Sequence, residues 1–592
     1  MKTGRSLVLA AIVTLTVTVI VTVTVLVAGC GGASTEAATP APVAAPPPPP
    51  TPSGAPKPTS VTVSLVGTAD LHGRVSALPV LGGYLENLRR ARSADGGVVL
   101  VDAGDMFQGT LESNLGEGAA VVTAYNLLGY AAATIGNHEF DFGPVGEVSV
   151  AREPGDDPRG ALKARAREAH FPFLAANIYD AATKKPVDWD NVHPFVVVEV
   201  AGVKVGIIGV TSESTPRTTV SANFVGLVMA PLAKTIADDA AAARDQGATV
   251  IVVVAHAGGN CKRFDDPKDL SSCDKDAEIF QVARDLPAGT VDAIVAGHTH
   301  AGVAQEIAGI PIVQSYANGQ AIGRIDLQVD ADGRVTGHTI YPPRDLCRDK
   351  KRDAACDPGD YEGAPVQAEA AIAKGIEPAI ERAREQRAEK LGITVTEKIT
   401  RHYDKESALG NLAADLMRAA HPKVDAALTN GGGLRADLPV GPLTYGDVFE
   451  AFPFDNRFAF IKMTGADLAT IVRANLQHDA GILSISGVRA RARCAGDKLE
   501  VTLFRAGGRI VRPDEKLTIA TSDFLATGGD GFFAGVKLDP SATVLDPGPP
   551  FREAIAGGLR AHGGTLSGSD PRIIDPKKPR LDYQGARPVT CR

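Results

Sequence analysis

The chain lacks an excess of positive charge. Its 61 Lys and Arg residues are outnumbered by 69 Asp and Glu residues, which leaves a net charge of −8. This balance gives no electrostatic basis for binding a nucleic acid polymer or an anionic membrane surface, so any recognition of phosphate must be local. Internal repeats are not visible either. Aromatic residues make up only 5% of the chain, with a single Trp, which says little about function.

What is present is the composition of a soluble globular protein. Hydrophobic residues make up 44% of the chain and charged residues 22%, and both values are ordinary. With 592 residues, the chain should form more than one hydrophobic core, so we expect two domains. Strands and helices alternate over residues 61–346, which favours an α/β layered fold.

The N-terminus has the pattern of an export signal. Lys2 and Arg5 precede an uncharged Val/Thr-rich stretch over residues 6–28, and small residues lead into Cys30. Small residues before a cysteine resemble the bacterial lipoprotein box, so we expect residues 1–29 to be a signal peptide that is removed before a lipidated Cys30. The apolar run is also long enough to be a membrane-spanning anchor. Under either interpretation the protein is exported and held at a membrane, on its periplasmic or cell-surface side.

Residues 30–60 are rich in Ala, Pro, Thr and Ser and have almost no apolar bulk. Such a segment cannot bury a core, and its proline run favours a stiff, extended tether.

Six cysteines remain after Cys30, and an even number in an exported chain predicts disulfides. Six cysteines allow fifteen pairings. Proximity along the chain favours Cys261–Cys273 and Cys347–Cys356, which leaves Cys494–Cys591.

The stretch GNHEFD, residues 136–141, places an amide, an imidazole and two carboxylates after a small-residue apolar run. The neutral oxygen of Asn137 can fill a metal position without adding charge. His138 can act on a substrate while Asp141 fixes its tautomer. Taken alone, G-N-H-E is also typical of a surface turn.

Four other segments place polar residues at the ends of apolar runs: Asp70 to His72, Gly104-Asp105, His256, and GHTH at residues 297–300. Continuous apolar runs of this length are typical of parallel strands buried on both faces. Functional groups in open α/β sheets gather beyond the carboxyl ends of strands, so we expect five strand ends to converge on one crevice. Any single histidine here could be a hydrogen-bonded core residue. Oxygen and imidazole ligands together, without cysteine, favour two divalent ions such as Zn or Mn.

The motifs D-x-H, G-D-x-x-x-G, G-N-H-E and G-H-T-H, in this order, resemble those of the calcineurin-like metallophosphoesterases. The longer form GNHEFD resembles the 5'-nucleotidase branch. The C-terminal half agrees, because three of its motifs resemble the nucleotide-binding domain of that branch: NGGGLR (residues 430–435), PFDN (453–456) and TGGDG (527–531). The resemblance covers residues 61 to about 535.

This resemblance implies a domain organisation for the α/β fold. A four-layer metallophosphoesterase sandwich would span residues 61–346 and a linker with an interdomain helix residues 347–391. A C-terminal α/β substrate-binding domain would span residues 392–592. The helix itself is expected over residues 367–391, where Ala, Glu, Lys and Arg favour a solvated helix.

The resemblance also implies two divalent ions, Zn or Mn with Co as a further option, and their ligands. Site one would be Asp70, His72, Asp105 and His300, and site two Asp105, Asn137, His256 and His298. Asp105 would be the shared ligand. Some bacterial members have Gln where His300 stands, and imidazole there would alter metal preference. His138 would stabilise the transferring phosphoryl group, oriented by Asp141.

The same resemblance assigns substrate contacts in the C-terminal half. Phe454 and Phe524 would stack on the two faces of a base, although Phe is also common in protein cores. Arg435 would bind phosphate through its guanidinium fork. The remaining contacts would be Asn430 and Asn456 with ribose or base, Asp530 with ribose hydroxyls, and the loop containing Gly432. The family's further arginine has no counterpart in strict register, since this chain has Arg401, Tyr403 and Lys405 there.

We therefore expect an exported, membrane-anchored dimetal 5'-nucleotidase that releases phosphate from nucleoside monophosphates. Within the same scaffold, the alternatives are a UDP-sugar pyrophosphatase and a 2',3'-cyclic nucleotide phosphodiesterase. A non-catalytic surface lipoprotein is the alternative outside the enzymes, but every expected ligand position is filled. Nothing in the sequence implies a protein partner.

Overall fold

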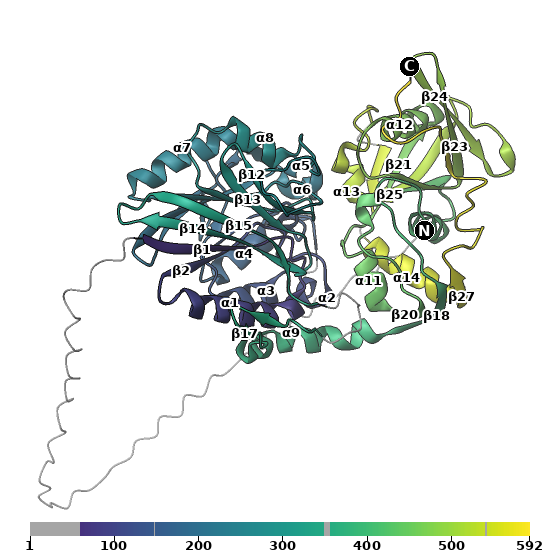
Figure 1. Cartoon of the computed structure of the whole chain (residues 1–592). Coiled ribbons are helices and arrows are strands. Elements are labelled where there is room, and N and C mark those ends of the chain that lie inside the picture. The colour runs from purple at the N-terminus through teal and green to yellow at the C-terminus, as the bar shows by residue number, and fades with distance from the viewer. Residues whose placement is uncertain (1–59, 147, 349–355, 539–541, 547, 592) are drawn as a thin grey trace, which may run out of the picture. The chain divides into compact units, whose positions relative to one another are not determined.

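Figure 1 shows the computed structural model of the protein, which describes residues 60–146, 148–348, 356–538, 542–546 and 548–591. The predicted signal peptide, Cys30 and the tether up to residue 59 lie outside the described residues. The described residues all belong to one unit of tertiary contacts. Within these ranges, no helix has both the length and the apolar character needed to cross a bilayer.

Two large sheets form within residues 60–345. The first has seven strands in the order β15–β14–β1–β2–β3–β4–β6: β1 (Ser60–Thr68), β2 (Gly96–Asp102), β3 (Ala132–Thr134), β4 (Phe173–Leu174), β6 (Val192–His193), β14 (Ala321–Asp330) and β15 (Val335–Asp345). The second has six in the order β12–β13–β11–β10–β8–β7: β7 (Phe195–Val200), β8 (Val203–Thr211), β10 (Val250–His256), β11 (Ala293–Ala296), β12 (Gly302–Ile307) and β13 (Ile310–Ser315).

Each strand that precedes a polar motif has at least one parallel neighbour. In the first sheet β1, β2 and β3 pair in parallel, while β14 and β15 are antiparallel. In the second sheet β8, β10, β11 and β13 pair in parallel, while β7 and β12 are antiparallel edge strands. The expected parallel strands are therefore present, and their carboxyl ends lie at one edge of each sheet.

Buried side chains on both faces of these strands create four layers. In β10, Val252 and Val254 pack between the two sheets, and Ile251 and Val253 pack on the opposite face. This second face is covered by α7 (Leu232–Asp245) and α8 (Glu278–Asp285), and α1 (Leu78–Arg92) and α3 (Ala119–Leu128) cover the far face of the other sheet. Figure 1 shows these helices on opposite sides of the strands. The layered α/β fold is confirmed.

Short elements connect these layers: α2 (Leu111–Asn114), α4 (Gly160–Glu168), α5 (Thr215–Thr218), α6 (Ser221–Phe224), and the pair β5 (Ile178–Asp180) and β9 (Leu227–Met229). Residues 152–165 are rich in charge, which favours a solvated segment, but Arg165 is buried. It donates to the Gly116 carbonyl (2.6 Å) and pairs with Glu168 (2.6 Å).

The expected linker helix is α9 (Ala370–Ala388), preceded by the small hairpin of β16 (Asp360–Tyr361) and β17 (Ala364–Pro365). It is less solvated than its composition suggested, because Ile372, Ile376 and Ala383 are buried. The N-terminal end of α9 approaches α1 closely: a Cβ added at Gly82 would lie 2.7 Å from the Ile372 side chain. Glycine at that position therefore allows the two helices to pack.

Residues 390–582 form three smaller sheets. A five-stranded sheet has the order β22–β19–β25–β21–β26: β19 (Ala426–Asn430), β21 (Phe458–Thr464), β22 (Leu483–Ser486), β25 (Lys516–Ser522) and β26 (Thr543–Leu545). The others are β20–β18–β27 and β24–β23–β28: β18 (Lys390–Glu397), β20 (Gly441–Thr444), β23 (Val488–Ala495), β24 (Lys498–Arg505), β27 (Gly564–Ser567) and β28 (Leu581–Asp582).

Within the described residues of this half, five helices pack on the sheets: α10 (Ala408–Ala420), α11 (Tyr445–Ala451), α12 (Gly465–Gln477), α13 (Asp523–Ala526) and α14 (Phe551–His562). Two of them start at reciprocal capping boxes. Thr444 and Asp447 cap α11, and Thr464 and Asp467 cap α12, because each Thr accepts from the third backbone N–H and each Asp accepts from the Thr backbone N–H. The sequence therefore fixes where both helices begin.

The structure contains the two disulfides that chain proximity favoured and the third that they left over. They join Cys261 to Cys273, Cys347 to Cys356, and Cys494 to Cys591.

Candidate active site

The seven expected metal ligands all stand at the carboxyl ends of parallel strands. Asp70 and His72 follow β1, Asp105 follows β2, Asn137 follows β3, His256 is the last residue of β10, and His298 and His300 follow β11. The first three of these strands belong to one sheet and the other two to its partner. Both sheets therefore contribute side chains to the same edge of the sandwich.

Five of these residues have a left-handed backbone. The φ angles are 52° at Asp70, 49° at His72, 57° at Asp105, 79° at His298 and 55° at His300. Residues other than glycine rarely adopt this conformation, and such outliers gather at functional sites, where the surrounding structure holds them. The chain therefore turns sharply at each of these strand ends, and the turns bring the side chains together.

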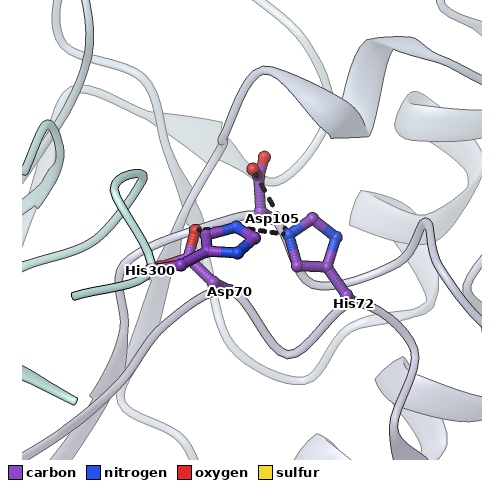
Figure 2. Close-up of side chains that lie close together, drawn as sticks. All are labelled: Asp70, His72, Asp105 and His300. Carbon is purple, nitrogen blue, oxygen red and sulfur yellow. Dashed lines mark hydrogen bonds and ion pairs between the residues drawn. The ribbon is translucent and has the colours of Figure 1, made fainter. Parts of the chain in front are cut away.

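A first group of donors comprises Asp70, His72, Asp105 and His300, which Figure 2 shows as sticks. Their ligand atoms all lie within 4.8 Å of one another. The Nε2 atoms of His72 and His300 are 2.9 Å apart, and His300 Nε2 is 3.5 Å from Asp70 Oδ1. A carboxylate pair and two imidazoles directed at one point are ligands that suit a divalent cation.

A second group shares Asp105 with the first. It comprises Asp105, His256 and His298, again within 4.8 Å. His256 Nε2 lies 3.2 Å from Asp105 Oδ2, 3.2 Å from His298 Nδ1 and 2.9 Å from Asn137 Oδ1. The structure thus brings all seven expected ligands together in two groups that meet at one carboxylate.

Hydrogen bonds behind the donors fix their orientation. His72 Nδ1 donates to the carbonyl of Gln108 (2.7 Å) and His256 Nδ1 to that of Ala103 (2.7 Å), so each ring directs Nε2 to the centre. Asn137 Nδ2 donates to the Thr218 carbonyl (2.8 Å), which leaves its oxygen directed at His256. Such supporting contacts set the tautomer and angle of metal-binding side chains.

Burial and neighbouring charges keep several of these imidazoles neutral. Burial and the His256 charge lower the pKa of His298 to about 3. Burial and the Arg435 guanidinium hold the pKa of His72 and of His300 well below the usual value. Burial would also lower the pKa of His256, but Asp105 raises it to about 10. His72, His298 and His300 are therefore neutral, as metal ligation requires, whereas His256 beside Asp105 would release its proton when an ion binds. With that exchange, this set of imidazoles and carboxylates fits divalent ions.

Glu139 was not singled out in the sequence, yet it holds two of the strand ends in place. Its side chain is buried, and its two oxygens accept backbone N–H groups from Asp105 (2.9 Å), Met106 (2.7 Å), Phe107 (3.3 Å) and Gly136 (2.7 Å). It therefore joins the loop after β2 to the loop after β3. Its place inside GNHEFD was the available signal, but the contact with the first loop is visible only in three dimensions.

His138 and Asp141 form the expected pair. His138 is the first residue of a single 3-10 turn (His138–Phe140) and Asp141 follows the turn, with His138 Nδ1 2.6 Å from Asp141 Oδ2. Asp141 is held in turn by the Thr219 hydroxyl (3.1 Å). Burial would lower the pKa of His138, but Asp105 and then Asp141 raise it above the ordinary value. An imidazole with this partner can hold a proton near the two donor groups.

One cavity of about 800 Å³ joins these groups to the C-terminal half. Its walls include five of the expected metal ligands, the His138–Asp141 pair, and all seven residues expected to contact substrate: Asn430, Gly432, Arg435, Phe454, Asn456, Phe524 and Asp530. Asp70 and His256 lie behind this lining and are fully buried. The cavity has the size of a site for a small ligand.

Several C-terminal side chains approach the metal-ligand residues directly. An Arg435 guanidinium nitrogen lies 3.2 Å from His72 Nε2 and 3.4 Å from His300 Nε2. The Phe454 ring lies 5.3 Å from the His138 ring and 5.6 Å from the Arg435 guanidinium carbon. Further along the wall, Asn430 Nδ2 donates to Asp530 Oδ2 (2.5 Å).

The segment of residues 401–405, which departs from the family pattern, contributes side chains to the cavity wall. Arg401 and Tyr403 both line it, and Lys405 is not among the lining residues. Asp479 and Gln108 are further lining residues that the sequence did not single out. Gln108 occupies a variable position of the G-D-x-x-x-G motif and Asp479 lies in no recognisable motif, so only the fold places these two side chains at the cavity.

A four-layer sandwich whose strand ends supply two donor sets with a shared carboxylate has the architecture of a dimetal hydrolase. Residues 63–302 match the family model of the calcineurin-like phosphoesterases, and residues 388–536 match that of the 5'-nucleotidase C-terminal domain. The chain belongs to the 5'-nucleotidase family of metal-dependent phosphoric ester hydrolases.

Individual relatives agree with this placement. The protein UshA of Yersinia enterocolitica is 27% identical over 78% of this chain and 83% of its own length. A 5'-nucleotidase of Vibrio parahaemolyticus is 25% identical over 85% of this chain and 90% of its own length. The crystal structure of a 5'-nucleotidase precursor from Thermus thermophilus shares the fold, with a TM-score of 0.67 at 23% identity over 88% of this chain and 99% of that one.

Proposed function

We propose that the protein is an extracytoplasmic dimetal 5'-nucleotidase that hydrolyses nucleoside 5'-monophosphates to nucleoside and phosphate. The proposal rests on one observation: the expected metal ligands and the expected nucleotide contacts line the same cavity, of about 800 Å³. A small nucleotide can reach both walls at once. Its phosphate would lie at the strand ends and its base among the C-terminal side chains.

The two donor groups are the proposed metal sites. Asp70, His72, Asp105 and His300 would hold one ion, and Asp105, Asn137, His256 and His298 the other, with Zn, Mn or Co as the metal. When bound, two such ions activate water and neutralise phosphoryl oxygens. The chain's own part is to hold the donors in place, through the carbonyls behind His72 and His256 and through Glu139.

Two cationic groups would act on the phosphoryl group itself. His138, oriented by Asp141, would donate a hydrogen bond to a phosphoryl oxygen as negative charge develops there. Arg435 would form paired hydrogen bonds to the same group through its guanidinium fork. In the overall reaction the oxygen of water bonds to phosphorus, the bond from phosphorus to the ribose oxygen breaks, and the leaving nucleoside oxygen takes up a proton.

The nucleoside would be recognised on the opposite wall. Phe454 and Phe524 are half-buried and line the cavity, so each can offer a ring face to a base. The amide of Asn430 and the carboxylate of Asp530 lie together, which suits the neighbouring hydroxyls of a ribose. Asn456 and the loop at Gly432 would complete this wall.

We also propose the division of the chain that the sequence suggested: a phosphoesterase domain over residues 61–346, a linker over residues 347–391 and a nucleotide-binding domain over residues 392–592. The two large sheets end with β15 at Asp345, and α9 follows in the proposed linker. The first strand of the C-terminal sheets, β18, begins at Lys390, two residues before the proposed boundary.

Export and lipid anchoring at Cys30 remain proposals from the N-terminal sequence. The three disulfides support export, because disulfides persist in oxidising compartments outside the cytoplasm.

A phosphate-release screen tests the proposed activity. The metal-loaded protein would be assayed with the four common ribonucleoside 5'-monophosphates, a UDP-sugar and a 2',3'-cyclic nucleotide. We expect the highest kcat/KM with a 5'-monophosphate. Asp105→Asn should abolish release, whereas Asp514→Asn, at an exposed carboxylate outside the cavity, should not change it. Faster turnover of the UDP-sugar or the cyclic nucleotide would assign the alternative function on the same scaffold.

A further inference from the structure

A second cavity, of about 760 Å³, lies in the C-terminal half and shares no lining residue with the candidate active site. It is bounded by the C-terminal turns of α10, the β22–β23 connection, the end of β24 with the turn that follows it, and the segment before β28. No motif of the sequence and no step of the proposed reaction involves it.

The walls of this cavity are strongly basic. Seven cationic side chains line it against two carboxylates, those of Asp415 and Asp582; the seven are Arg418, Arg489, Arg491, Arg505, Lys577, Lys578 and Arg580. The chain as a whole has a net charge of −8. The cluster is therefore a local reversal of charge, which attracts anions to this part of the surface.

Three of the seven cations are already neutralised. Arg580 forms a bidentate pair with Asp415 (2.8 and 2.7 Å), and Arg491 pairs with Asp582 (3.2 Å). Arg505 pairs outside the cavity, with Asp425 (2.9 Å) and Glu515 (2.8 Å). The first pair joins α10 to the segment before β28, the second joins β23 to β28, and the third holds the end of β24 to the segments before β19 and β25.

The other four cations have no carboxylate partner within 4.0 Å in the part of the chain that the structure describes; they are Arg418, Arg489, Lys577 and Lys578. Arg418 is nevertheless fixed in place. Its Nε donates to the Ser486 hydroxyl (2.9 Å), which donates to Asp415 (2.6 Å). Among the described residues, the two terminal nitrogens of this guanidinium have no hydrogen-bond partner, so both are available to an acceptor in the cavity.

We propose that this cavity binds a phosphate group, either as inorganic phosphate or as the phosphoryl group of a small ester. A cluster of like charges repels itself, and a multiply charged oxyanion offsets that repulsion while accepting hydrogen bonds from arginine forks and lysines. A small anion is favoured over a polymer because the chain as a whole has a net charge of −8, which repels a polyanion beyond the cavity. Phe504 lines one side with the Arg491 guanidinium carbon 5.3 Å from its ring, and the turn at Gly507 and Gly508 adjoins it.

The position of the cavity separates it from the proposed catalysis. In the β19–β22 pair, Ser486 lies opposite Ala427, and Leu483 lies opposite Asn430. Ser486 lines the basic cavity and Asn430 lines the candidate active site, so the two cavities lie towards opposite ends of this strand pair. Changes at the basic cavity can therefore be made without touching proposed catalytic residues.

The test is calorimetric titration of the metal-loaded full chain with inorganic phosphate. The wild-type protein should show two binding events, one at each cavity. The double variant Arg489→Gln/Lys578→Gln removes two exposed cations and should weaken one event about tenfold or more, while phosphate release from a mononucleotide stays unchanged. The matched control is Lys498→Gln/Arg512→Gln, which removes two exposed cations that do not line the cavity and should bind as the wild type does.

An isotherm for the double variant that equals the wild-type isotherm would overturn the proposal. So would equal weakening in the control variant, since that would reflect net charge alone. A second titration, with a ten-residue phosphodiester oligomer, tests whether the ligand is a polymer. If the oligomer binds wild type more tightly than phosphate does, and the double variant removes that difference, the ligand is a polymer and the small-anion proposal is wrong. The binding isotherms do not rely on turnover, so loss of the proposed 5'-nucleotidase activity and loss of phosphate binding at the basic cavity would be told apart.

Discussion

Replacing Phe454 with alanine should weaken the binding of substrates that contain a base much more than the binding of substrates that lack one. The Phe454 ring lines the cavity near His138 and the Arg435 guanidinium. Stacking of a base on an aromatic side chain contributes about 1–3 kcal/mol, which corresponds to about 5- to 150-fold in affinity. The contact with Arg435 adds about 0.5–1 kcal/mol, and its loss would affect every phosphate ester alike. We therefore expect a large rise in KM for AMP and only a two- to fivefold loss with p-nitrophenyl phosphate or ribose 5-phosphate, by the same conversion.

The assay is steady-state phosphate release from the three substrates under one set of metal and salt conditions. Phe449→Ala is the matched control. Phe449 also lies beside an arginine, 4.2 Å from the Arg552 guanidinium carbon, but it is a core residue that does not line the cavity. Its replacement should lower stability and affect the three substrates equally. Equal losses on AMP and ribose 5-phosphate in Phe454→Ala would refute the stacking role and make Phe454 a packing residue. Phe524→Ala should behave as Phe454→Ala does, with a smaller effect on base-free substrates because no contact with Arg435 is involved.

Four further outcomes are expected. Removal of metal by a chelator should abolish activity and Mn, Co or Zn should restore it, so full turnover by metal-free protein would contradict the proposed sites. His138→Ala should lower kcat by roughly 10²–10⁴ with metal content retained, and loss of one ion would make His138 a ligand instead. Glu139→Gln turns an acceptor into a donor facing backbone N–H groups, so chemical denaturation should show a loss of about 2–4 kcal/mol in unfolding free energy; an unchanged value would mean that the loops hold without it. Cys30→Ala should leave the precursor uncleaved, and mass spectrometry of the wild-type N-terminus decides whether Cys30 is lipidated or the segment is retained intact.

The positions of the proposed ligands were predictable because each stands at the end of a buried apolar run. Such runs are visible in the sequence. Because parallel strands present functional groups at their carboxyl ends, the polar residue after each run can be assigned to the site. Asp70, Asn137 and His256 could be placed in this way, and the structure brings them together as expected. The role of each remains a prediction that the experiments above test.

Other features depend on contacts between distant segments and could not be read from local patterns. Glu139 holds the loop after β2, more than 30 residues earlier in the chain. Strand β18 pairs with β27, about 170 residues later, and β27 is too short to give a periodic signal. The burial of Ile372 in α9 follows from the close approach that Gly82 permits, and composition alone favoured a solvated helix. The basic cavity likewise arises from four separate stretches of chain, each of which resembles an ordinary solvated surface.

The left-handed backbone at the strand ends implies a trade-off between durability and activity. Each non-glycine residue in that conformation costs roughly 1–2 kcal/mol relative to glycine, and five proposed ligands adopt it. His300 has little to offset this cost, since its side chain is 31% exposed and its nearest polar contacts are other residues of the site. A glycine at that position would relieve the backbone and remove a ligand in the same step. Selection for stability alone would therefore favour replacements that remove ligands from this site.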